Sequence, residues 1–330
     1  MNRMSSEVRS GLIEAHDIVE QNRLASIWRV THRQLSAGKF LGRTRYATLR
    51  GILLYRQTWS SSGLVSGLTP ANYLALGGPS SPQTHIRWRG EALNAGCLAY
   101  GLDSAETDFL LPDGSDHWVI LVPKDKLVRY FGEETAAAVV RSRDVLRCEA
   151  GLGLQLFAMV ERVIGRLQTD GGSHADDLTL NAIESQLLGT VAEILLAADE
   201  GAGRSTARKR YLACHRALGC VDGLKMPITV PELAARVGVS ERVLELGFKE
   251  NLGIPPQKYI RWNRMNRLHR ELRASRRGDT TVTEMANRWG FHELGRTAVE
   301  YKQLFGESPS ESLAGDPKTT FKRLADIVRE

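Results

Sequence analysis

The feature of this chain that most constrains its fold is a pattern that occurs twice in the last third of the sequence. Residues 228–249 and 281–301 each hold apolar residues at helical spacing, then a glycine, then a second helical run. Gly238 and Gly290 let the backbone turn between the two runs. Two short helices joined by such a turn make a helix-turn-helix unit. Two units on one chain predict contact with two successive major grooves of a DNA duplex.

The apolar positions of each unit also indicate which residues point outward. In the first unit, Leu233 and Val237 give the first helix an apolar face, and Leu244 and Phe248 return one from the second helix. Ser240 stands where it can cap that second helix. The outward positions of each second helix are expected to face the DNA bases. The predicted DNA-contacting residues at these positions are Ser240, Arg242, Glu245 and Leu246 in the first unit, and Leu294, Gly295, Arg296 and Val299 in the second.

A long basic helix is predicted between the units, starting at Pro255 and running to about Arg277. Residues 258–277 carry eight Lys and Arg against one Glu. The basic excess belongs to this end of the chain, because residues 204–330 hold 24 Lys and Arg against 15 Asp and Glu, whereas the remainder holds 20 against 23. Such an asymmetry is typical of phosphate binding. We expect phosphate contacts to be densest here, with Lys258 and Arg261 among them.

The first third of the chain has a different pattern. Residues 1–22 are predicted to be a polar lead-in, and short apolar runs broken by Gly, Pro and Ser follow as far as residue 122. Many short strands at this spacing favour a cupin-like β-barrel over residues 1–123. The predicted strands are residues 46–50, 51–56, 73–76, 96–100 and 117–122, with turns at 37–38, 77–79 and 112–114.

Residues 124–200 are predicted to be a helical dimerisation segment. Apolar residues recur there at three- and four-residue spacing, and long helices of this kind need a partner surface. The predicted helices are residues 124–131, 133–140, 146–168 and 178–199, with a linker at Gly201 and Gly203. The predicted fold class is therefore α+β, with an N-terminal cupin-like β-barrel, this helical segment, and an all-α double helix-turn-helix domain at residues 207–314.

The C-terminal domain resembles the AraC/XylS family of transcription factors. The resemblance implies seven helices, binding to double-stranded promoter DNA as a homodimer, and transcriptional activation, with RNA polymerase as a partner. Leu246 and Val299 stand where the family often has polar residues, which favours apolar contact with thymine methyl groups. The motifs that carry the resemblance are Ala234-Ala, Gly238-Val-Ser, Phe248-Lys-Glu-Asn-Leu-Gly, Pro255-Pro-Gln-Lys-Tyr-Ile, Trp289-Gly-Phe and Tyr301-Lys-Gln-Leu-Phe-Gly-Glu-Ser-Pro.

Two local patterns concern the effector that such a regulator senses. Residues 29–33 form an R-x-x-x-R pair, and residues 58–63 a Ser- and Gly-rich turn. This order resembles the cyclic-di-GMP motifs of PilZ domains and the cyclic-di-GMP-sensing, AraC-like exopolysaccharide regulators. Two guanidinium groups can clamp phosphates or guanine edges, and the turn can donate hydrogen bonds. Thr58 departs from the motif, which has Asp or Asn there. The predicted ligand-binding residues are Arg29, Arg33, Arg45, Thr58, Trp59, Ser60 and Gly63.

Two alternatives stay open at this stage. The signature at residues 294–298 is ethanolamine-regulator-like and favours a different small metabolite as effector. A cupin-type enzyme fused to a DNA-binding domain is the rival class, but no catalytic motif is found and His32, His85 and His117 are too dispersed for a cupin metal site. The four cysteines form no C-x-x-C pair. We expect a cytoplasmic protein without enzymatic activity, metal, cofactor, export signal or membrane span.

Overall fold

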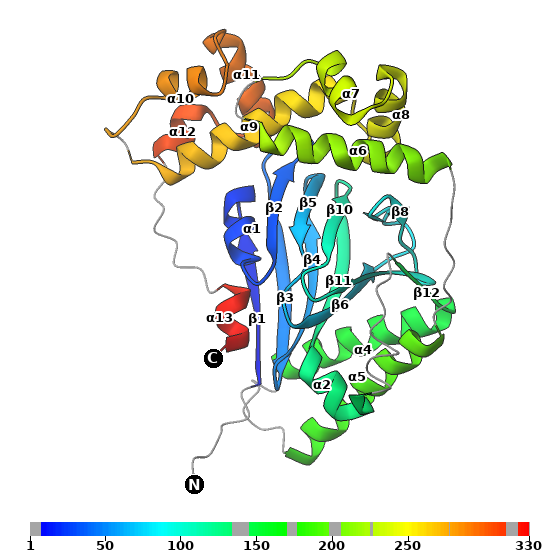
Figure 1. Cartoon of the computed structure of the whole chain (residues 1–330). Coiled ribbons are helices and arrows are strands. Elements are labelled where there is room, and N and C mark those ends of the chain that lie inside the picture. Colours follow the sequence, from blue (N-terminus) through cyan, green and yellow to red (C-terminus); the bar gives the residue numbers. More distant parts are fainter. Residues whose placement is uncertain are drawn as a thin grey trace.

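The protein is built from two antiparallel β-sheets with helices at both ends of the sheet pair (Figure 1). The computed structural model describes residues 8–133, 145–169, 177–197, 206–224, 227–276, 278–314 and 323–329. The larger sheet has seven strands in the order β1-β3-β4-β11-β6-β9-β12. These strands are Arg9–Ala15 (β1), Gly42–Leu49 (β3), Ile52–Trp59 (β4), Tyr73–Pro79 (β6), Cys97–Leu102 (β9), Ser115–Pro123 (β11) and Val145–Arg147 (β12).

The smaller sheet has five strands in the order β2-β5-β10-β7-β8. Within the described residues the two sheets are separate, so the predicted barrel is an open pair of sheets that pack through their apolar side chains. The mixed α+β class is confirmed. The smaller sheet consists of Arg29–Gln34 (β2), Gly63–Leu68 (β5), Arg87–Trp88 (β7), Glu91–Ala92 (β8) and Glu106–Leu111 (β10).

Two sequence predictions for this region were wrong. Much of the predicted lead-in is ordered: β1 pairs with β3, and helix α1 (Ile18–Leu24) follows it with Asp17 as its N-cap. Gly77 and Gly78 do not turn the chain but lie inside β6. A Cβ atom on Gly77 would lie 2.7 Å from the Trp118 carbonyl oxygen on β11. The glycine is therefore needed for close approach of two strands.

The helical segment covers the larger sheet. Helix α2 (Lys124–Phe131) lies where it was predicted, and the two long helices are α4 (Ala150–Thr169) and α5 (Asp177–Ala197). Residues 146–149 were predicted to be helical, but 146 and 147 belong to β12 and the helix begins at Ala150. Most of the predicted helix at 133–140 lies outside the described residues. Buried residues of α4 and α5, such as Val160 and Leu187, share one apolar core with the sheet.

Helix α5 is the one described helix that is long and apolar enough to cross a membrane by length and composition. This is weak evidence for a membrane span, because a core helix of a globular protein passes the same test. Leu187, Val191 and Leu195 of α5 are buried in the core that α4, α5 and the sheet share.

The C-terminal helices form a layer across the other end of the sheets (Figure 1). Its seven helices, α6 to α12, match the number that the family resemblance implies. The predicted linker at Gly201 and Gly203 lies outside the described residues. The seven helices are Thr206–Gly223 (α6), Val230–Val237 (α7), Glu241–Leu252 (α8), Pro256–Ala274 (α9), Val282–Arg288 (α10), Leu294–Phe305 (α11) and Pro309–Ala314 (α12).

A last short helix, α13 (Leu324–Arg329), returns from the helical layer to the sheets (Figure 1). Leu324 and Ile327 are buried in a cluster with Tyr55 and Leu121 of the larger sheet. Helix α13 therefore packs against the N-terminal domain.

Candidate nucleic-acid interface

The first helix-turn-helix unit consists of α7 and α8, and its local sequence explains both helix ends. Thr229 and Glu232 form a reciprocal capping box at the start of α7, and Gly238 ends the helix with a left-handed φ of 71°. The Ser240 hydroxyl accepts a hydrogen bond from the Val243 N–H and so caps α8, as predicted. Leu233 and Leu244 are fully buried between the two helices, so the unit has its own core.

The second unit, α10 and α11, repeats this construction. Thr281 and Glu284 form the capping box, and Gly290 has a φ of 71° in the turn. Phe291 and Tyr301 are buried against α9. Helix α9 therefore carries one unit at each end, as the sequence predicted.

The predicted DNA-facing residues of α8 do point outward. Arg242, Glu245 and Leu246 are exposed, and 39% of Leu246 is accessible. Arg242 makes no ion pair with any residue that the structure describes. A free guanidinium on this face can donate two hydrogen bonds to a guanine edge.

The corresponding face of α11 is more apolar and its arginine is paired. Gly295 is exposed, Leu294 is half-buried, and 59% of Val299 is accessible. Arg296 lies 3.5 Å from the Glu293 carboxylate and 3.0 Å from that of Glu300. Helix α8 thus presents an arginine without an ion pair to a described residue, whereas α11 presents a paired arginine and a more apolar face.

Several arginines of α9 make contacts inside the protein, and the predicted phosphate contacts stay a prediction. Arg267 donates to the Leu224, Val221 and Asp222 carbonyl oxygens, and Arg261 pairs with Glu300. Among the predicted α9 contacts, Lys258 is exposed, with its ammonium 4.3 Å from the Trp262 ring centroid. Periodicity alone placed these arginines on several faces but could not identify their partners.

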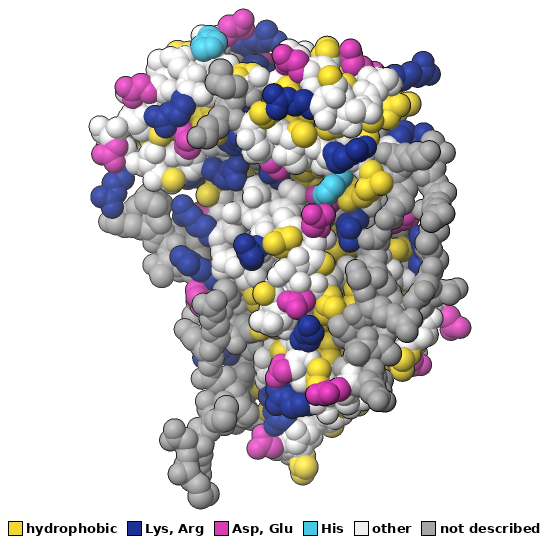
Figure 2. Space-filling view, viewed as in Figure 1, with side chains coloured by type: hydrophobic (Ala, Val, Ile, Leu, Met, Phe, Trp, Pro, Cys, Tyr) yellow, Lys and Arg dark blue, Asp and Glu magenta, His cyan; other side chains and the backbone are white. Residues whose placement is uncertain are grey.

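A wide groove lies between the two units and is also lined by the first half of α9 and by residues 35–37 of the N-terminal domain. Its volume is about 1360 Å³, and residues of both α8 and α11 line it. Charges of both signs interleave over the helical domain (Figure 2). The charged residues that line the groove are Glu241, Glu245, Lys258, Arg261, Arg264, Glu293, Arg296 and Glu300.

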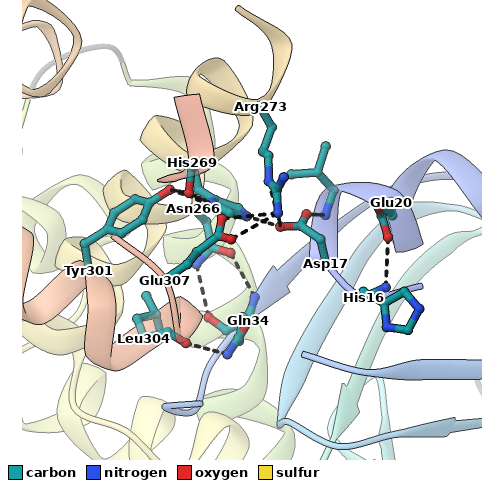
Figure 3. A network of polar contacts seen from close by, with 12 residues as sticks. His16, Asp17, Glu20, Gln34, Asn266, His269, Arg273, Tyr301, Leu304 and Glu307 are labelled. Carbon is teal, nitrogen blue, oxygen red and sulfur yellow. Dashed lines mark hydrogen bonds and ion pairs between the residues drawn. The ribbon is translucent and has the colours of Figure 1, made fainter. Parts of the chain in front are cut away.

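A buried polar network joins the N-terminal domain to α9 (Figure 3). The Asp17 carboxylate lies 2.6 Å from His269 Nε2 and 3.2 Å from an Arg273 guanidinium nitrogen. Burial disfavours the charged Asp17, but His269 and Arg273 outweigh it and lower the pKa of this carboxyl to about 2. On its other ring nitrogen, His269 contacts the Tyr301 hydroxyl of α11. One acidic residue of the N-terminal domain is therefore coupled to the second unit.

The same network is a candidate metal cluster by residue type. Ligand atoms of Asp17, His269 and Glu307 lie within 4.8 Å of one another. The Arg273 guanidinium already pairs with both carboxylates, so the charge that a cation would supply is present. Sequence reasoning missed the role of Asp17, although the Asp-x-x-Glu spacing of Asp17 and Glu20 is a helix-start signal that could have shown an ordered element.

Two residues at the end of β2 also bind the helical domain. The Arg33 guanidinium is almost fully buried and lies 2.6 Å from Asp222 of α6, and it also donates to Asn263 of α9. The backbone N–H of Gln34 donates to the Asn266 side chain, and the Gln34 side chain donates to the Leu304 carbonyl oxygen. Arg33 was predicted to clamp a ligand, but in this arrangement it connects two domains.

The other predicted effector residues do not form one open site with Arg33. Trp59 is 1% exposed and packs against His32 and Phe40, so its ring is not available to stack on a base. Arg45 lies on the larger sheet and faces Glu161 and Gln168 of α4.

The rest of the predicted effector motif is divided between the two ends of β2. Arg29 is exposed at the start of the strand, and Gly63 pairs with Gln34 at its end. Thr58 is half-buried on β4, and the exposed Ser60 bonds to the Leu41 and Lys39 backbone. The fold thus places Arg33 close to the end of the 58–63 segment, whereas Arg45 lies away from both.

A small cavity lies between the two sheets, which the sequence did not indicate. Its volume is about 50 Å³, and its polar lining includes Gln57 and two buried histidines. Burial lowers the pKa of His32 to about 3 and that of His117 to about 4, so both are neutral at pH 7. Leu324 of α13 closes one part of the wall.

Comparison with known proteins agrees with the geometry of the helical domain. A family of helix-turn-helix domains matches residues 233–314. A probable thc operon regulatory protein from Rhodococcus erythropolis is 34% identical over 203 residues, which cover 59% of this chain and 58% of that protein. A XylDLEGF operon transcriptional activator 1 from Pseudomonas putida is 25% identical over 238 residues, 69% of each chain. The helical domain is therefore similar to helix-turn-helix domains and to these regulatory proteins.

The solved structures that resemble the chain are more distant. The AraC-like transcriptional activator CuxR is 14% identical, with a TM-score of 0.42 over 77% of this chain and 94% of its own. At that level the likeness decides neither ligand nor function. Part of the chain, 41% by length, lies outside the match to the Rhodococcus protein. Both sequence relatives carry names of regulatory proteins, in agreement with a non-enzymatic chain.

Proposed function

We propose that this protein is a cytoplasmic, AraC-type transcriptional regulator that binds promoter DNA with α8 and α11. The observation that carries the proposal is the pair of helix-turn-helix units on one helix, each with its outward face exposed. Apolar Leu246 and Val299 on these faces suit contact with thymine methyl groups, and Arg242 suits a guanine. RNA polymerase is the expected partner of an activator.

Selection from random duplexes tests this function. The full-length protein is incubated with a pool of duplexes of about 30 base pairs, long enough for two half-sites one helical turn apart. We expect enrichment of a sequence with two short elements roughly 10 base pairs apart. A pool that stays random after repeated rounds, with protein that is folded by circular dichroism, would contradict the proposal.

We also propose cyclic di-GMP as the effector, controlling exopolysaccharide-type genes. Support comes from the R-x-x-x-R pair on β2 and from the neighbouring 58–63 turn. Because Arg33 is paired with Asp222 of α6, a ligand phosphate that took the Arg33 guanidinium would replace that carboxylate. Effector binding would then loosen a contact between the two domains, which is a physical route for coupling.

Isothermal titration of the full-length protein with cyclic di-GMP tests the effector. Arg29→Ala is a better test than a substitution of Arg33, because Arg29 is exposed and its loss leaves the Arg33–Asp222 pair intact. We expect binding heat for the wild type and about a tenfold or greater loss of affinity for Arg29→Ala. Arg43→Ala, an exposed arginine on the larger sheet, is the matched control. Absence of heat for the wild type would refute this effector.

A small metabolite bound between the sheets is the second candidate effector. The observation that favours it is the cavity lined by His32, His117 and aromatic side chains. A volume of about 50 Å³ is below that of usual ligand pockets, so such a ligand would have to displace a wall residue such as Leu324. Ethanolamine in the same titration distinguishes the two candidates.

A further inference from the structure

Glu300 occupies a distinctive position on the second helix of the second unit. One of its carboxylate oxygens pairs with Arg261 of α9, and the other lies 3.0 Å from Arg296 of α11. Its own side chain is 25% exposed, and these two arginines hold the pKa of its carboxyl below the ordinary value despite burial. Glu300 therefore forms ion pairs with two arginines at once.

The two arginines lie between the two helix-turn-helix units. Both line the groove between the units, together with Glu300 itself. Arg296 is 68% exposed and lies near Glu293 as well as Glu300, and Arg261 is 33% exposed. Removal of the Glu300 charge therefore frees Arg261 and leaves Arg296 only the longer, 3.5 Å contact with Glu293. In the first unit, by contrast, Arg242 is exposed and makes no ion pair with a described residue. The second unit has the same kind of cation but keeps it neutralised.

We propose that Glu300 is a specificity-determining residue that withholds Arg261 and Arg296 from DNA phosphates. This inference rests on the proposed DNA-binding function. A phosphate contact strengthens binding to every sequence equally, whereas an apolar contact from Val299 distinguishes thymine from other bases. Pairing of the two arginines with Glu300 lowers the affinity for random DNA. Discrimination between base sequences then depends on the exposed apolar face of α11.

Glu300→Gln tests the proposal, because it removes the charge and keeps the size of the side chain. Binding of the full-length protein to a selected site and to random duplex is measured by fluorescence anisotropy over a series of salt concentrations. Each phosphate contact steepens the slope of log K against log salt by about 0.9. We expect Glu300→Gln to steepen the slope by about 1 to 2, to tighten binding to random duplex at low salt, and to reduce the ratio of specific to random affinity.

A double-mutant cycle separates release of arginines from simple loss of a negative charge. Arg261→Gln and Arg296→Gln are each made in the wild type and in Glu300→Gln. If the arginines are released, each substitution lowers random-duplex affinity more in Glu300→Gln than in the wild type. Glu250→Gln is the matched control, because Glu250 is also an acidic residue on the second helix of a unit but pairs with Arg210 of α6, outside the groove.

Three outcomes would overturn the inference. These are a wild-type slope for Glu300→Gln, the same gain for Glu250→Gln, and a gain that survives removal of both arginines. All three require wild-type protein that binds the selected duplex, so they differ from failure of the proposed function, in which the wild type selects no sequence. Thermal unfolding of each variant checks that the fold is kept.

Discussion

At the scale of single residues, the two exposed arginines of the DNA-facing helices are not equivalent. Arg242 projects from α8 without a described partner, whereas Arg296 of α11 is paired with Glu293 and Glu300. A side chain that is already hydrogen-bonded in the free protein has to give up that contact before it binds DNA. The sequence predicted equal roles for the two; the partners distinguish them.

Arg242→Ala is therefore expected to weaken specific binding more than Arg296→Ala. Loss of a bidentate arginine–guanine contact costs about 1–3 kcal/mol, which is roughly a 5- to 150-fold loss of affinity, and relaxes selectivity at one base position. Competition binding with duplexes that carry single base changes measures both effects. If Arg296→Ala proved the more damaging variant, the assignment of free and withheld arginines would be wrong.

At the scale of elements, α4 and α5 bury one side against the larger sheet and leave apolar residues on the other. Leu178 and Leu196 of α5 are 79% and 64% exposed, and their spacing of 18 residues, five helical turns, places them on the same face. Leu154 of α4 is 52% exposed. We infer that this face meets a second copy of the chain, as the predicted dimerisation segment requires.

Leu178→Glu combined with Leu196→Glu is expected to raise the dimer dissociation constant by at least about tenfold, because each leucine contributes roughly 1.5–3 kcal/mol when buried. Sedimentation equilibrium measures the change. Leu12→Glu, at an exposed leucine of β1, is the matched control. Dissociation by the control and not by the double variant would place the interface at the sheet edge instead.

At the scale of the whole molecule, the N-terminal domain binds the helical layer through buried polar contacts from β2 and from Asp17, just before α1. Asp17 reaches His269 and Arg273, and Arg33 reaches Asp222. These contacts cross between segments more than 180 residues apart in the sequence. A ligand that breaks one of these contacts would therefore change how the two units are held relative to the sheets.

Asp17 makes this coupling dependent on pH. Its pKa is lowered from 3.8 to about 2 in the folded protein, so the stabilisation is complete above about pH 4 and is lost as the pH falls towards 2. The shift corresponds to roughly 2 kcal/mol. Asp17→Asn is expected to lose about this much at pH 7 and to show a flatter acid limb, measured by urea unfolding between about pH 1.5 and 7, a range that includes both pKa values. Parallel acid limbs for variant and wild type would exclude this role.

The sequence by itself determined the helix-turn-helix units, because their signals are local. Capping residues such as Thr229 and Thr281, turn glycines such as Gly238, and apolar residues at helical spacing act within one or two helical turns. For the same reason α2 and α5 were predicted close to their observed bounds.

Only the tertiary structure decided which charges are available. Arg33, Arg261 and Arg267 look like ligand or phosphate contacts in the sequence, yet each is bonded to a residue far along the chain. The pairing of β1 with β3 and the open sheet pair were likewise not visible, since they depend on contacts between distant segments. Whether a charged side chain can bind a ligand depends on its partner in the folded protein, and the sequence alone does not identify that partner.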